Sequence, residues 1–170
     1  QTNGIQLNNE WCSFLKEKSF EISVSIDGPN FIHDSYRVSK NGKPTHSLTL
    51  KGIKLLQEYG IRFTTISVIT DYTLNYPYEF FNFFIDEGIE QIGLSIEDSL
   101  LSPSSLLTNE NKLKYEKFIA DLFELYYPVK EKVNIRDFDL FEQNIFHDTS
   151  GFRRNAQTYP FHIVSLGVKG

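Results

Sequence analysis

Short apolar stretches alternate with amphipathic ones along most of the chain. In residues 21–26 the apolar side chains of Ile22, Val24 and Ile26 occupy every second position, which predicts a strand of about six residues. Residues 62–69 (RFTTISVI) and 91–96 (QIGLSI) have the β-branched, apolar character of buried parallel strands. Residues 2–4 are typical of the last residues of an earlier strand and its turn.

Between these strands, apolar residues recur at helical spacing. Asn8 or Asn9 can cap a first helix, Thr45 a second one and Thr108 or Asn109 a long one, while Pro77 suits a helical first turn. Glycines 60 and 88 and Pro128 end three of these helices. The predicted apolar stripes are Trp11, Phe14 and Leu15; Leu48, Gly52, Leu55, Leu56 and Tyr59; Phe80, Phe81, Phe84 and Ile85; and Tyr115, Phe118, Ile119, Leu122, Phe123 and Tyr126.

The order of strand and helix predicts right-handed βαβ units and hence a parallel sheet in an α/β fold. We expect strand 21–26, with residues 2–4, to form the edge of this sheet, with Val24 and Ile66 facing inward. Residues 33–44 and 102–105 are predicted loops. After residue 133 the alternation fades into a possible strand at 133–138, a polar segment at 147–157 and an apolar one at 161–168.

Composition excludes several classes of protein. A net charge of −5 argues against nucleic acid as the main partner, and no apolar run reaches the roughly 20 residues of a membrane helix. One cysteine suits a reducing compartment, so we expect a cytoplasmic protein. The chain has no methionine and begins at Gln1-Thr2, which suggests an internal fragment of a longer protein.

Polar side chains follow the first predicted strand. Ser25 and Asp27 end it at an Asp27-Gly28-Pro29 turn, and Arg37 lies ten residues further on. Because sites on alternating strand–helix folds form at the carboxyl ends of the strands, we expect Ser25 and Asp27 there, together with Ser95 or Glu97. Asp27 either forms a structural pair with Arg37 or binds a ligand. Glu97 and Asp98 suit acid–base work or a solvated loop about equally.

Other residues with chemical potential have simpler explanations. Cys12 has no CxxC partner and is best explained as a small core or surface thiol. The four histidines, 33, 46, 147 and 162, lack the spacing of a metal site, so no zinc site is predicted.

Several motifs together resemble a known superfamily. The stretches SIDGP, IHD..R and THSLTLKGI, with TNG near the start, are similar to the central region of radical S-adenosylmethionine (SAM) enzymes that carry a SPASM-type C-terminal domain. This superfamily includes the anaerobic sulfatase-maturating enzymes. Residues 66–97, with NIRDF at 134–138 and PFHIVS at 160–165, resemble more closely the cyclophane-forming maturases of glycine-rich-repeat peptides.

The resemblance implies a fold and a chemistry. The fold is a (β/α)6 partial TIM barrel, of which residues 1–138 would form strands 3–6 with their helices, and 139–170 a linker toward a SPASM-type domain. The chemistry is hydrogen abstraction from a ribosomally made peptide or protein by a radical made from SAM at a [4Fe–4S] cluster. The CxxxCxxC cluster ligands do not occur in this chain, so no metal ligand is assigned to it.

The resemblance also assigns cofactor-binding residues by position. Ser25 and Asp27 match residues that face the ribose and carboxylate of SAM, and Arg37 would assist with that carboxylate. Ser67, Leu94 and Ser95, with Thr70 and Ile96, would line the ribose and adenine. The alternatives are a non-catalytic truncated remnant and a fragment of a different TIM-barrel enzyme; in the latter, a metal site would place histidines and carboxylates at several strand ends.

Overall fold

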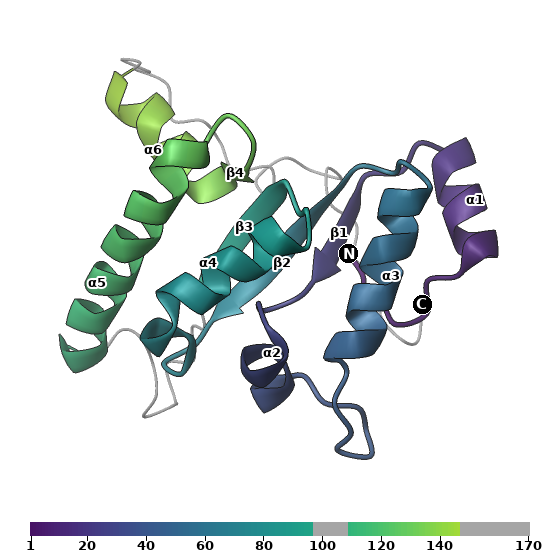
Figure 1. The fold of residues 1–170 in the computed structure, drawn as a ribbon, viewed down its shortest axis with the longest axis horizontal. Coiled ribbons are helices and arrows are strands. Elements are labelled where there is room, and N and C mark those ends of the chain that lie inside the picture. Colours follow the sequence, from purple (N-terminus) through teal and green to yellow (C-terminus); the bar gives the residue numbers. More distant parts are fainter. Residues whose placement is uncertain (97–108, 147–170) are drawn as a thin grey trace, which may run out of the picture. The chain divides into compact units, whose positions relative to one another are not determined.

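The computed structural model describes residues 1–96 and 109–146. Contacts divide the chain into two units, Gln1–Asp139 and Leu140–Gly170. In the first unit, four parallel strands lie in sequence order: β1 (Ile22–Ser25), β2 (Phe63–Ile69), β3 (Gln91–Ile96) and β4 (Asn134–Ile135) (Figure 1). The parallel sheet and its three main strands are confirmed. The fold is therefore α/β, in the order that successive βα units of a barrel have.

Helices connect the strands. Local signals in the sequence explain their ends: Asn8 Oδ1 accepts a hydrogen bond from the Trp11 N–H at 2.9 Å, Pro77 begins α4, and Gly60 and Gly88 adopt positive φ after α3 and α4. The helices are α1 (Asn9–Glu17), α2 (Asn30–Tyr36), α3 (His46–Glu58), α4 (Pro77–Asp86), α5 (Asn109–Tyr126) and α6 (Arg136–Phe146), with 3₁₀ turns η1 (Thr73–Asn75) and η2 (Tyr127–Val129).

The strand register gives the sheet two different faces. Val24, Thr65, Ile92 and Ile135 stand side by side in one row, and each is at most 1% exposed. This is the helix-covered face. The opposite face, called the uncovered face below, carries small, polar or partly exposed side chains: Ser23, Ser25, Thr64, Ile66, Val68, Gly93 and Ser95.

Aromatic side chains fill the space between the helices and the covered face. The Phe80 ring lies 5.1 Å from Phe84 and 5.8 Å from Phe118, so α4 and α5 share one core. At the other end of the sheet, a Cβ on Gly52 would lie 2.2 Å from the carbonyl oxygen of Gly4. Because only glycine permits that approach, α3 lies directly against the turn that precedes α1.

As expected, β1 lies at one edge of the sheet, together with residue 2. The Thr2 N–H donates to the Ser23 carbonyl at 2.8 Å, and the Ser25 N–H donates to the Thr2 carbonyl at 2.9 Å, so residue 2 pairs in parallel with β1. The expected orientation of Val24 is wrong. Its side chain is fully buried on the helix-covered face, whereas Ile66 lies on the uncovered face and is partly exposed.

Other expectations need correction. The predicted loop at 33–44 begins inside α2, and the possible strand at 133–138 is two residues long before α6 begins. Helix α3 buries Thr49, Gly52, Ile53 and Leu56, so its buried face is rotated from the predicted stripe. Trp11, Phe14, Leu48 and Ile85 are exposed, whereas Cys12 and Phe83 are buried in their helices. The segments 102–105, 147–157 and 161–168 lie outside the described residues.

Candidate functional site

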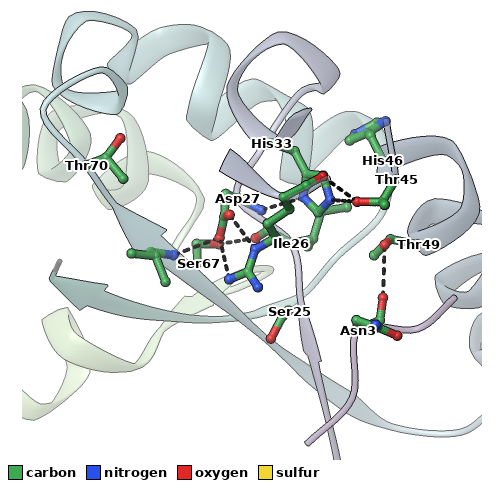
Figure 2. A network of polar contacts seen from close by, with 12 residues as sticks. Asn3, Ser25, Ile26, Asp27, His33, Thr45, His46, Thr49, Ser67 and Thr70 are labelled. Carbon is green, nitrogen blue, oxygen red and sulfur yellow. Dashed lines mark hydrogen bonds and ion pairs between the residues drawn. The ribbon is translucent and has the colours of Figure 1, made fainter. Parts of the chain in front are cut away.

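An ion pair forms at the carboxyl end of β1. The Arg37 Nε donates to Asp27 Oδ2 at 2.5 Å and Nη2 donates to Oδ1 at 3.0 Å, while the Val68 N–H donates to Oδ1 at 2.9 Å (Figure 2). The Asp27 side chain is 6% exposed and that of Arg37 is 29% exposed. A carboxylate this buried needs such partners, and the bidentate geometry supplies them. The structural pair between Asp27 and Arg37 is therefore present.

A neutral histidine, His33, contacts the backbone of Asp27 and so helps to fix this pair. His33 Nδ1 accepts a hydrogen bond from the Asp27 N–H at 3.3 Å, and its Nε2 lies 3.1 Å from Thr45 Oγ1. Because Thr45 Oγ1 donates its own hydrogen to the Arg37 carbonyl at 2.6 Å, Nε2 must be the donor toward Thr45. Burial lowers the pKa of His33 to about 4, although the nearby Asp27 carboxylate opposes the shift.

The segment that holds Arg37 is joined to the next helix. Asp34 Oδ1 accepts the backbone N–H groups of Thr45 and His46, at 2.8 and 2.9 Å, and so caps the first turn of α3 in place of the Thr45 side chain. This cap fixes α2 relative to α3, and with it the backbone on which Arg37 is carried.

The remaining predicted site residues divide between the two faces. Ser25 is buried on the uncovered face, where its Oγ accepts from Gln1 Nε2 at 3.0 Å. Ser95 lies beside Val68 on the same face and is exposed. Ser67 is fully buried on the covered face and donates to the Ile26 carbonyl at 2.6 Å. Leu94 is its register neighbour and so lies on the covered face as well.

The predicted placement at the carboxyl end of the strands is thus confirmed for Ser25, Asp27 and Ser95, and Glu97 lies outside the described residues. The side chains of Ser67 and Leu94 do not share the uncovered face with them. Thr70 is buried and its hydroxyl pairs with that of Thr73 at 3.0 Å, which makes it part of the η1 turn.

Sequence reasoning gave His33 and Asp34 no individual role, and it assigned Thr45 only as a helix cap, a part that the Asp34 carboxylate takes instead. A signal for them exists, since a His-Asp pair and a Thr-His pair flank a short polar segment. His46 also lies in this cluster, with its ring 5.5 Å from that of His33 and 5.4 Å from that of Phe83. Burial lowers the pKa of His46, and its Nε2 atom is buried without a hydrogen-bond partner in the described structure.

The described residues do not fit an iron–sulfur cluster. They contain no group of three histidine, cysteine or acidic side chains that could hold a metal ion, and Cys12 is fully buried in α1, where burial raises the pKa of its thiol. Two guanidinium nitrogens of Arg37 bond to Asp27, and Nη1 makes no hydrogen bond to the described residues.

Comparison with known proteins relates this geometry to a family. No protein-family model matches the chain. An uncharacterised protein of Synechocystis is 31% identical over 172 residues, which is all of this chain and 43% of that protein. The serine-type anaerobic sulfatase-maturating enzyme of Bacteroides thetaiotaomicron is 44% identical over 84 residues, 49% of this chain and 20% of the enzyme.

Solved structures agree with the sequence matches. The structure of native anSMEcpe with bound AdoMet and the Cp18Cys peptide matches with a TM-score of 0.76 and 25% identity, over 85% of this chain and 42% of that one. This chain is a homologue of the anaerobic sulfatase-maturating enzymes. Its parallel sheet and helices match part of the fold of that structure, as expected for a segment of the partial barrel of radical SAM enzymes. The chain spans less than half the length of the maturating enzymes it matches. No helix in the described residues is both long and apolar enough to span a membrane.

Proposed function

We propose that the chain is the SAM- and substrate-facing part of a radical SAM enzyme that modifies a side chain of a ribosomally made peptide or protein. The single observation that carries this is the match, over most of the chain, to a maturating enzyme whose structure contains both AdoMet and a peptide. The uncovered face supports it, because small and polar side chains leave room for ligands at the carboxyl end of the strands.

Each residue has a defined part in this proposal. Ser25 and the Asp27–Arg37 pair hold the ribose and carboxylate of SAM, with Arg37 Nη1 as the donor that Asp27 leaves available. Ser95 lines the same face, and Ser67 and Leu94 contribute through their backbone beside the adenine. A [4Fe–4S] cluster together with SAM would supply the radical chemistry that removes a substrate hydrogen atom, and the residues named above would bind and orient SAM for it.

The remaining assignments follow from the same resemblance. Residues 139–170 lead toward a SPASM-type domain. The cytoplasmic location is proposed instead from the single cysteine, which suits a reducing compartment. Within the superfamily, the stretches at 66–97 and 134–138 favour a cyclophane-forming maturase over a sulfatase-maturating enzyme.

The test uses the protein as its gene encodes it. After anaerobic reconstitution with iron and sulfide and reduction, incubation with SAM should yield 5′-deoxyadenosine, detected by mass spectrometry. Arg37→Gln should lower the affinity for SAM because it removes the carboxylate donor, whereas Arg62→Gln, which removes an exposed charge before β2, should not. The absence of both SAM binding and 5′-deoxyadenosine in the wild type would refute the proposal and favour a non-catalytic protein.

A further inference from the structure

An arginine outside the predicted site lies on the uncovered face of the sheet. A Cβ built on Gly93 would lie 3.3 Å from Cζ and Nη2 of Arg136 and 3.4 Å from its Nη1. Three nearly equal distances mean that the plane of the guanidinium faces the strand. The guanidinium therefore packs flat against Gly93 in β3, in space that the side chain of any larger residue would partly fill.

This guanidinium retains its capacity to donate hydrogen bonds. Among the described residues its charged neighbour is Asp137, whose Oδ2 is 3.8 Å from Nη2, which is longer than a hydrogen bond. That oxygen instead accepts the Leu94 N–H at 2.9 Å. The Arg136 side chain is 53% exposed, so its planar set of donors is accessible from the uncovered face.

The position of Arg136 separates it from the cofactor residues. Gly93 shares a row with Ile66 and Ser25, and neighbouring strands are about 4.8 Å apart, so the guanidinium stands roughly 10 Å across the sheet from Ser25. At the β1 end, the Asp27 carboxylate is already neutralised by Arg37. A ligand bound there leaves Arg136 to contact a second molecule on the same face.

We propose that Arg136 binds a carboxylate of the peptide substrate, an aspartate or glutamate side chain near the modified residue. The guanidinium can hold both carboxylate oxygens at once, and Gly93 keeps its plane oriented for this. The proposal rests on the proposed function. The carboxylate of SAM has the same chemistry, and the experiment separates the two sources.

The experiment is selection of a random peptide library displayed on phage against the full-length protein in the presence of SAM. The wild type should enrich an acidic residue at one position by roughly tenfold or more, as expected for a charge-assisted hydrogen bond. Arg136→Gln should abolish this enrichment, Arg136→Lys should keep part of it, and Gly93→Ala, which displaces the guanidinium, should weaken it. Arg62→Gln is the matched control and should enrich like the wild type.

Affinity for SAM, measured by calorimetry on each variant, separates the two sources of the carboxylate. All four variants should bind SAM as the wild type does. If Arg136→Gln weakens SAM binding without changing the selected peptides, the guanidinium serves the cofactor and the proposal is overturned. It is also overturned if the wild type binds SAM but enriches no acidic residue, or if Arg136→Gln enriches the same one. A wild type that does not bind SAM contradicts the proposed function instead.

Discussion

The buried neutral His33 makes the stability of the fold depend on pH. The pKa of His33 is about 4 in the folded chain, whereas the ordinary pKa of a histidine, which we take for the unfolded chain, is 6.5. A histidine whose folded pKa is depressed contributes stability that is complete above the unfolded pKa and is lost as the pH falls from about 6.5 toward 4. The two values predict a loss of about 2 kcal/mol in the free energy of unfolding between pH 7 and pH 5. This is a substantial share of a typical total of about 5–15 kcal/mol.

Protonation has an identifiable structural cost. It adds a hydrogen to Nδ1, the atom that accepts the Asp27 N–H, and thereby breaks the support behind the Asp27–Arg37 pair. Urea unfolding followed by circular dichroism at pH 7, 6 and 5 measures the effect. His33→Gln is the comparison, because glutamine offers an acceptor and a donor without titrating in this range.

The difference between the two proteins isolates His33 from the other titrating groups. Between pH 7 and 5, the free energy of unfolding of the wild type should fall by about 2 kcal/mol more than that of His33→Gln. The urea midpoint of the wild type should therefore fall further than that of the variant. Equal losses in both proteins, or an NMR titration of His33 with a pKa above 6, would show that the histidine is not held neutral by this network and would refute the reasoning.

Three further predictions concern single positions. Asp27→Asn should destabilise the chain by up to about 3 kcal/mol, because it leaves the partly buried Arg37 guanidinium without its countercharge; an unchanged urea midpoint would contradict this. Gly52→Ala should destabilise the chain by about 1–3 kcal/mol, because the added Cβ meets the Gly4 carbonyl. Gly42→Ser is the comparison and should destabilise it less: residue 42 has a positive φ, but the space around it is open. Residues 1–170 alone, reconstituted anaerobically, should hold no stoichiometric iron, since one cysteine cannot supply three cluster ligands; a cluster absorption band with matching iron content would count against the assignment.

Local patterns in the sequence were enough for the elements of the fold. Alternation in 21–26, β-branched residues in 62–69, and caps such as Asn8, Pro77 and Gly88 each act within a few residues, so the strands and most helices were predictable. The Asp27–Arg37 pair was also an open possibility, because its partners are ten residues apart and follow one strand.

Only the tertiary structure decided which face each side chain occupies. Ser67 and Ser95 both follow from strand sequences that look suitable for a site, but the register buries the first under the helices and exposes the second. The same holds for the bond from the Val68 N–H to Asp27, 41 residues away in sequence. It also holds for Arg136 at the start of α6, whose guanidinium lies against Gly93 in β3. Periodicity constrains side chains relative to their own element, whereas pairing between strands distant in sequence determines what those side chains meet.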